Sequence, residues 1–255
     1  MIIRADFERE ALRKGGARLA TLLQKLATMV APEVSVMSLE AEAQKLIKET
    51  GDTPAFLGYQ PHGAKRPYPA ALCVSINDAI VHGIPEEGTV IQDGDVVTLD
   101  CGLVHEDFIT DSAVTVYAGT VSEEKKLLIR ATEEALAAGI NAARTGNHMG
   151  DIGYAIERVG KKYSLGSPRE LGGHSVGNAV HEEPFVPNFG TPGKGPILEE
   201  GMVIAIEPMF MLGSSGIRLD ADGYTYRTRD GSCSAHSEHT VIVGAQGAEV
   251  LTKRP

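Results

Sequence analysis

Four acidic residues stand at positions where a carboxylate could do chemistry, and the first two share one segment. Asp100 and Asp111 lie at either end of LDCGLVHEDFITD, which predicts a tight hairpin. If the chain turns at His105–Glu106, the two aspartates face each other with Cβ atoms about 4.5–5.5 Å apart. Carboxylates at that separation repel unless a proton or cation lies between them. The pair favours a metal site, although a longer loop would leave both at the surface.

The other two acids lie within apolar, strand-like runs. Glu207 in VIAIEPMF and Glu238 in SAHSEHTVIV would each cost several kcal/mol if buried as unpaired charges. Outward-facing strand positions would remove that cost. The segment GGHSVGNAVHEEP adds His174 and His181, although a lone histidine is more often a hydrogen-bonded structural residue than a ligand.

Together, four carboxylates and one imidazole make an oxygen-rich ligand set whose negative charge would balance two divalent cations. Such a set suits Mn, Fe, Co or Zn in a paired site, with the ions roughly 3.5–4 Å apart. Hydrolysis is the natural chemistry of this arrangement. Cys73, Cys101 and Cys233 lack CxxC spacing, so they predict reduced thiols instead of a disulfide framework or a zinc knuckle.

Length, composition and charge indicate what kind of protein carries this site. A chain of 255 residues, 42% of them hydrophobic, can bury one substantial core, which predicts a single domain over residues 1–255. Its apolar stretches are too short to cross a bilayer, and MIIRADFERE is charged where a signal peptide would be apolar. We therefore expect a cytoplasmic protein without membrane contact. The net charge of −10 argues against tight nonspecific binding of nucleic acids, and we expect no specific nucleic-acid partner.

Hydrophobic periodicity predicts an α+β fold. Helical spacing covers residues 6–30, and a second helix is expected to begin at Ser38, whose hydroxyl can cap it. The same order recurs with SEEKKLLIRATEEALAAGINAAR, capped by Ser122, and with MGDIGYAIERVGKKY. Strand-like segments follow each helix pair, which indicates a duplicated helix–helix–sheet unit.

The predicted strands are separated by turn-forming residues, which favours hairpins and an antiparallel or mixed sheet. They are DVVTLDCGLV, FITDSAVTVY, MVIAIEPMFML, YTYRTRD and CSAHSEHTVIV. The Pro- and Gly-rich segment Tyr59–Pro69 predicts an exposed loop.

The residue order now permits a comparison with a known family. Asp100, Asp111, His174, Glu207 and Glu238, with the segments CVSINDAIVHGIP, IEPMF and DGYTYRTRDGSCSAHSEHT, resemble the methionine aminopeptidases of the pita-bread superfamily. The resemblance implies a pita-bread fold with pseudo-twofold halves of about 5–120 and 121–250, and a curved, mainly antiparallel sheet covered by helices. The short span between His181 and Glu207 implies a type I member.

The resemblance also assigns roles. Asp100 would bind one metal ion, His174 and Glu207 the other, and Asp111 and Glu238 both. Glu207 would assist proton transfer during hydrolysis of the N-terminal methionine of peptides and nascent chains with a small second residue. His82 and His181 would contact the substrate amide and the developing tetrahedral intermediate. The implied partner is a peptide N-terminus, with a monomer expected and a ribosome contact left open.

The methionine pocket implied by the resemblance is apolar and aromatic. Its counterparts here are Phe56, Tyr59, Cys73, His82, Val180, His181 and Tyr224. The chain departs from the family at Val180, where phenylalanine is usual, at Tyr224, where tryptophan is common, and in a longer segment before Cys73. Tyr68 on that segment is a candidate replacement for a pocket tyrosine.

Two other functions fit parts of the same sequence. Gly173–Gly177 satisfies the GxSxG pattern of a serine hydrolase with Ser175 as nucleophile, and Asp220 and His239 follow in the required order. A related pita-bread hydrolase, such as an X-Pro peptidase, would share the five metal ligands. Such enzymes normally carry an extra N-terminal domain, for which this chain has no room.

Overall fold

Four helices form close to where the sequence predicts them. The computed structural model describes residues 1–254 and contains α1 (Asp6–Met29), α2 (Val36–Glu49), α3 (Glu123–Ala142) and α4 (Met149–Tyr163). Ser122 caps α3 as predicted, because its hydroxyl accepts a hydrogen bond from the amide of Lys125. Among residues 1–254, no helix combines the length and apolarity needed to cross a membrane.

The predicted start of the second helix is wrong by three residues. Ser35 is the N-cap of α2, and its hydroxyl accepts from the amide of Met37 at 3.2 Å. Ser38 lies inside the helix, where its hydroxyl donates to the Ser35 carbonyl. The apolar face of α2 already begins at the buried Val36, so the serine directly before that residue is the one that caps the helix.

Strands follow each helix pair. The first set comprises β1 (Thr53–Pro54), β2 (Leu72–Ile76), β3 (Ala79–Val81), β4 (Val96–His105) and β5 (Phe108–Tyr117). The second comprises β6 (Gly172–Ser175), β7 (Glu182–Pro187), β8 (Val203–Ile206), β9 (Met209–Met211), β10 (Ile217–Leu219), β11 (Tyr226–Thr228), β12 (Ser234–His236), β13 (His239–Ile242) and β14 (Glu249–Val250). The fold is α+β, as predicted.

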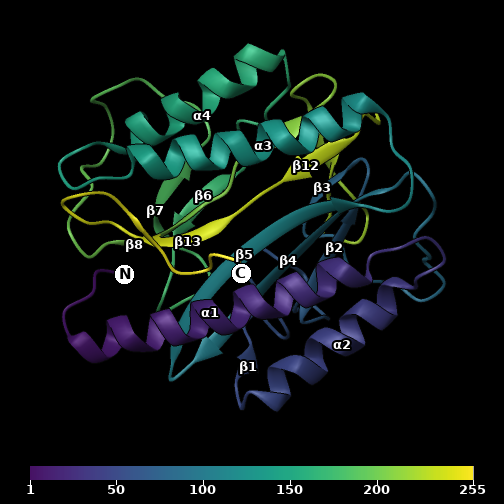
Figure 1. Cartoon of the computed structure of the whole chain (residues 1–255), viewed down its shortest axis with the longest axis horizontal. Helices are drawn as coiled ribbons and strands as arrows, with labels where there is room; N and C mark the ends of the chain where they lie inside the picture. Colours follow the sequence, from purple (N-terminus) through teal and green to yellow (C-terminus); the bar gives the residue numbers. More distant parts are fainter. Residues whose placement is uncertain (255) are drawn as a thin grey trace.

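The strands pair in antiparallel fashion into two larger sheets and two smaller ones. One larger sheet has the order β1-β4-β2 with β5 also on β4, and the other has the order β14-β13-β8-β6-β7. The smaller sheets are β10-β11-β3 and β12-β9. Figure 1 shows the pair α1–α2 and the pair α3–α4 on opposite sides of β5 and β13.

Four apolar clusters fill the interior of the described part of the chain, and three of them bear on the functional site. One joins α1 and α2 to β2, β4 and β5, and a second joins α3 and α4 to the strands of the later sheet. The third contains Phe56, Cys73, Val180 and Tyr224 together with Val203 of β8, so it draws on segments from the whole length of the chain. The functional site described below lies against this third cluster.

The β4–β5 hairpin differs from its prediction in register. The turn residues are Glu106 and Asp107, with φ of 48° and 69°, instead of His105–Glu106. Positive φ at both central positions gives the turn that matches the twist of a two-residue hairpin. Asp111 therefore pairs with Gly102, and Asp100 pairs with Ala113. The aspartates are diagonal neighbours on one face, and not directly opposite.

Two predicted long strands are each broken at an acid. MVIAIEPMFML divides into β8 and β9 around Glu207–Pro208, and CSAHSEHTVIV divides into β12 and β13 around Ser237–Glu238. Proline cannot donate to a ladder, which explains the break on the first side. The register is the same before and after the break, because Ile206 pairs with His239 and Met209 with His236. Glu207 and Glu238 thus lie opposite each other where the ladder opens.

The segment Tyr59–Pro69 is a loop, but it is only partly exposed. Tyr68 is 4% exposed, and its amide donates to the Tyr59 carbonyl at 2.8 Å. The Tyr68 carbonyl accepts from the amide of Gly58. The loop folds back on itself and carries Tyr68 inward. The three cysteines are free and buried, in agreement with the sequence.

Candidate metal centre and substrate pocket

One cavity brings together the five candidate metal ligands and every residue that the resemblance implies for substrate binding. It is lined by Phe56, Tyr59, Pro61, Tyr68, Cys73, His82, Asp100, Asp111, His174, Val180, His181, Glu207, Tyr224 and Glu238. The five candidate metal ligands come from β4, β5, β6 and the two strand breaks, so segments 138 residues apart in the chain, from Asp100 to Glu238, meet at one site.

Three of the candidate ligands form a compact group. Donor atoms of Asp111, His174 and Glu238 all lie within 4.8 Å of one another. His174 Nε2 also lies 3.5 Å from Glu207 Oε1. The other ring nitrogen of His174 is 3.0 Å from the carbonyl of Ser175, and a donor bond there leaves Nε2 free to bind a metal.

Hydrogen bonds between β5 and the β13 segment hold two of the acids in place. Thr240 Oγ1 accepts from the amide of Asp111 at 2.9 Å and donates to the carbonyl of Asp111 at 2.7 Å. The amide of Glu238 donates to the carbonyl of Ala113 at 3.1 Å. These bonds fix Asp111 and Glu238 on one side of the cavity, independently of any ligand.

The acids are buried without enough hydrogen-bond donors. Asp100, Asp111 and Glu238 are 7%, 3% and 2% exposed, and each has one carboxylate oxygen without a hydrogen-bond partner. Asp100 is paired across the sheet with Cys73, whose thiol cannot compensate a negative charge. A buried carboxylate without donors is costly, so these oxygens need a proton or a cation.

The pKa values of the site residues indicate the same need for a proton or a cation. Burial first, and repulsion by neighbouring carboxylates second, raise the pKa of Asp100, Glu207 and Glu238 well above the usual range. Burial also raises the pKa of Asp111 to about 7. Burial lowers the pKa of His174 to about 3, so its imidazole is neutral and its lone pair is available to a metal. Divalent cations fit this donor set, which is that of a metal-dependent hydrolase.

Three side chains stand beside the candidate metal ligands. The His174 and His181 rings meet edge-on with centroids 4.4 Å apart, and His82 lies 6.4 Å from His181. The Tyr59 hydroxyl is 2.9 Å from His181 Nδ1. If the hydroxyl donates to Nδ1, the proton of a neutral His181 sits on Nε2, where it is available to a substrate. Burial lowers the pKa of His82 to about 4, so this ring is also neutral.

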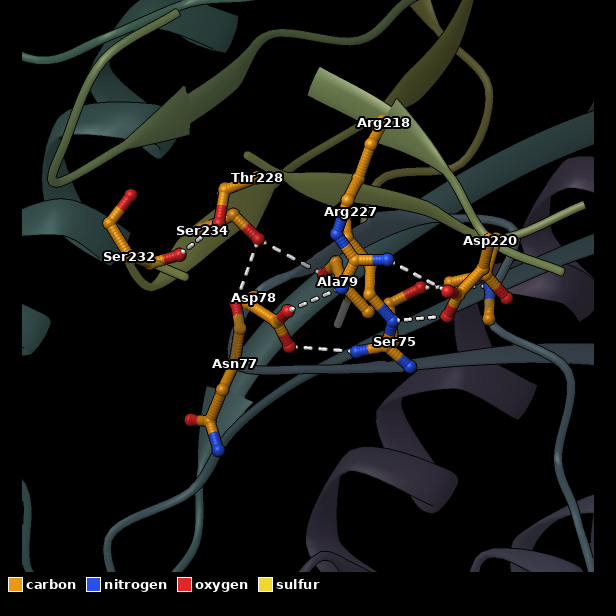
Figure 2. A network of polar contacts seen from close by, with 12 residues as sticks. Ser75, Asn77, Asp78, Ala79, Arg218, Asp220, Arg227, Thr228, Ser232 and Ser234 are labelled. Atoms are coloured by element: carbon orange, nitrogen blue, oxygen red, sulfur yellow. Dashed lines mark hydrogen bonds and ion pairs between the residues drawn. The ribbon is translucent and has the colours of Figure 1, made fainter. Parts of the chain in front are cut away.

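An ion-pair network clamps the β10–β11 hairpin onto β3, as Figure 2 shows. Arg227 Nη1 lies 2.7 Å from Asp78 Oδ1, and Arg227 Nε lies 2.5 Å from Asp220 Oδ2. The hairpin carries Tyr224 at its connection, and β3 leads directly into His82. The network therefore sets the spacing between one wall of the cavity and the histidine beside it.

Two lining residues lie outside the set predicted to bind substrate. Tyr68 packs edge-on against Tyr224 with ring centroids 5.2 Å apart, and its hydroxyl donates to the carbonyl of Gly83. The sequence named Tyr68 only as a candidate replacement for a pocket tyrosine. Pro61 was not named, and the loop containing both residues had no periodicity from which its path could be predicted.

His236 lies near the acids and was not named in the sequence analysis. It is 1% exposed, and its Nε2 lies 3.3 Å from Glu207 Oε2 and 4.0 Å from Glu238 Oε2. The available signal was the period of a strand, since residues 236 and 238 point to the same face.

The serine hydrolase alternative is wrong. Ser175 lies in β6, no helix follows it, and its hydroxyl donates to the carbonyl of Val203 at 2.9 Å. Asp220 is paired with Arg227 instead of a histidine. His239 Nδ1 is 2.9 Å from the hydroxyl of Thr252. The three residues have separate partners and form no triad.

Comparisons with known proteins point to one family. The model of metallopeptidase family M24 matches residues 10–245. A methionine aminopeptidase of Aquifex aeolicus is 46% identical over 248 residues, which cover 96% of each chain. Methionine aminopeptidase 1 of Mycobacterium tuberculosis is 42% identical over 98% of this chain and 94% of its own length. The crystal structure of the methionine aminopeptidase of Thermotoga maritima superposes with a TM-score of 0.94 at 36% identity, over the full length of both chains.

The chain belongs to metallopeptidase family M24 and, within it, to the methionine aminopeptidases. The predicted pita-bread fold is thereby confirmed. An Xaa-Pro dipeptidase of Bacillus anthracis has a TM-score of 0.78 at 22% identity, and this chain covers 62% of it. That likeness concerns the fold alone, and function depends on the site.

The raised carboxylate pKa values predict how the metal-free protein responds to pH. Asp111 has a higher pKa when folded than when unfolded, so its stabilising contribution is complete at low pH and is lost as the pH rises through about 7. Asp111→Asn mimics the protonated acid. In the absence of metal, we expect this variant to melt near the wild-type temperature below about pH 4, and at a temperature that exceeds it by more and more as the pH rises to about 7. Circular dichroism is the suitable probe, because the chain has no tryptophan.

The matched control is Asp107→Asn, at the exposed tip of the same hairpin. Its melting temperature should differ from wild type by an amount that does not change with pH. If the melting-temperature difference between Asp111→Asn and wild type also stays constant with pH, ionisation of Asp111 does not destabilise the folded protein.

Proposed function

We propose that the chain is a two-ion aminopeptidase that releases methionine from the N-terminus of peptides and nascent chains. The observation that carries the proposal is the gathering of four buried carboxylates and a neutral imidazole beside an apolar pocket. The charge of four carboxylates would balance two divalent ions, and the full-length similarity to methionine aminopeptidases supports the substrate.

Similarity to the methionine aminopeptidases supports a division of the ligands between two ions. Asp100 would hold one ion, His174 and Glu207 the other, and Asp111 and Glu238 both. The close approach of Asp111, His174 and Glu238 supports the shared roles. Mn, Fe, Co or Zn would suit these ligands, and when bound such ions lower the pKa of water and polarise a carbonyl group.

The side chains around the ligands would handle the substrate and the protons. Glu207 would take a proton from the attacking water and pass it toward the leaving amine. His181, oriented through Nδ1 by the Tyr59 hydroxyl, would donate to the oxygen on which negative charge develops. His82 would contact the amide of the scissile bond.

The apolar part of the cavity would bind the methionine side chain. Phe56, Tyr59, Val180 and Tyr224 form its walls, and Tyr68 extends the aromatic surface next to Tyr224. A thioether gains dispersion and sulfur–aromatic contacts from such walls. Burial raises the pKa of the Cys73 thiol well above its usual range, so this cysteine would line the pocket as a neutral group and not act as a nucleophile.

The setting of the enzyme follows from its sequence and belongs to the same proposal. We expect a cytoplasmic monomer that acts on peptide N-termini, as a single domain with two related halves. A contact with the ribosome would bring the site to nascent chains, and the acidic net charge gives no reason to expect other nucleic-acid partners.

Substrate choice and metal dependence test the function directly. Met-Ala-Ser should be cleaved, because methionine fits the apolar pocket and alanine is small. Formyl-Met-Ala-Ser should be refused, because the site needs a free amine near the ions. Chelation should abolish turnover and Mn, Fe or Co should restore it, as followed by chromatography of the products. Preferential cleavage of X-Pro peptides would instead favour the peptidase alternative, and chelator-resistant activity would refute the metal mechanism.

Replacing His174 and replacing His181 should impair the enzyme in different ways. His174→Ala removes a ligand, so bound metal and metal-dependent stability should both fall. His181→Ala should keep its metal and lose turnover by roughly 10²–10³-fold, as expected for a donor to transition-state charge. Elemental analysis and kinetics on Met-Ala-Ser separate the two effects. If His181→Ala loses metal while His174→Ala retains it, the assigned roles are reversed.

A further inference from the structure

His236 is a buried polar side chain that the proposed mechanism does not use. It belongs to β12 and is 1% exposed, and neither of its ring nitrogens has a hydrogen-bond partner. Burying a polar group without a partner is costly, so such a residue calls for a specific explanation. Carboxylate oxygens of Glu207 and Glu238 face it from the two strand breaks.

The backbone holds His236 firmly in this position. Its amide donates to Thr115 Oγ1 at 3.0 Å, and its carbonyl lies 2.6 Å from the same hydroxyl. Across the ladder it pairs with Met209, directly after the break at Glu207–Pro208. The ring therefore has little freedom to leave the neighbourhood of Glu207.

The two oxygens of Glu207 have different neighbours. Oε1 lies 3.5 Å from His174 Nε2, and Oε2 lies 3.3 Å from His236 Nε2. A normal N–H···O hydrogen bond spans about 2.7–3.2 Å, so the contact between Glu207 and His236 is only slightly longer than a formed bond. Histidine and carboxylate ligands of metals are commonly fixed by such outer hydrogen bonds.

The tautomer of His236 decides what it can do. A proton on Nδ1 would leave a buried N–H without an acceptor, which is rare in proteins, whereas a proton on Nε2 points toward Glu207. The less costly arrangement has Nε2–H as a donor and the Nδ1 lone pair unpaired.

We propose that His236 is a positioning residue whose Nε2–H donates to Glu207 Oε2 and thereby reserves Glu207 Oε1 for the ion shared with His174. The inference deepens the proposed function and rests on it, because it takes Glu207 to be a ligand. His236 itself touches neither the ion nor the substrate. Its effect is to fix which oxygen binds metal and which is available for proton transfer.

Two variants of His236 distinguish a hydrogen-bonding role of the ring from a space-filling role. His236→Gln keeps a neutral N–H donor, whereas His236→Leu keeps much of the volume without a donor. For His236→Leu we expect about 10–100-fold weaker Mn²⁺ binding by calorimetry, as is typical for loss of an outer-shell partner. kcat on Met-Ala-Ser should fall with little change in KM, and His236→Gln should restore both quantities to within a few-fold of wild type. His62→Leu, on the exposed part of the loop, is the control and should change neither.

The tautomer of His236 can also be determined in the wild-type protein. This measurement tests the proposal even if His236→Leu does not fold. Nitrogen-15 spectra of the histidines, assigned with His236→Gln, should show Nε2–H for His236 in the Zn²⁺-loaded protein, in which Glu207 is ionised. A proton on Nδ1, a His236→Leu variant equal to wild type, or equal loss of metal in both variants would each overturn the proposal. The last outcome would make His236 a direct ligand. Absence of wild-type activity on Met-Ala-Ser would refute the proposed function, while the tautomer and Mn²⁺ affinities would still decide the role of His236.

Discussion

Repulsion among four buried carboxylates is the constraint on which the rest of this structure depends. Asp100, Asp111, Glu207 and Glu238 share one cavity, and no lysine or arginine lines it. Buried carboxylates that stay charged require compensation, and those that stay neutral need raised pKa values. The site therefore stores an unfavourable interaction that a divalent cation would convert into a favourable one.

The fold supplies the rigidity that keeps these acids together. Two acids are diagonal neighbours on the β4–β5 hairpin, and two face each other where the β8–β13 and β9–β12 ladders are interrupted. The Thr240 hydroxyl, bonded to both backbone groups of Asp111, joins the first pair to the second. Side chains on strands cannot easily withdraw from one another, so the cost of ionising these acids together persists until a cation is bound.

Sequence reasoning was most successful where chemistry and order along the chain carried the information. The five candidate ligands were recognised by residue type and order, and the structure brings them to one cavity. The helix pairs and the β4–β5 hairpin followed from periodicity. The register of that hairpin did not, because the turn depends on left-handed backbone at Glu106 and Asp107, which neither residue type demands.

Other features depended on contacts between distant segments. The breaks at Glu207 and Glu238 are visible only once the two strands are paired, although Pro208 was a local indication of the first. Tyr68 enters the pocket because its loop folds back on Tyr59, which no local pattern predicts. His236 looked like an ordinary strand residue, and its importance comes from the side chains that surround it.

Proton release on metal binding tests the central claim most directly. Metal-free protein would be titrated with Mn²⁺ by calorimetry near the raised pKa of Asp111, about 7, in buffers of different ionisation enthalpy. Because the carboxylates must ionise to bind metal, the account predicts saturable binding of two ions per chain with release of protons to the buffer. Saturable binding without proton release would contradict the claim that these buried acids are protonated in the absence of metal. Absence of any saturable binding would contradict the metal centre itself.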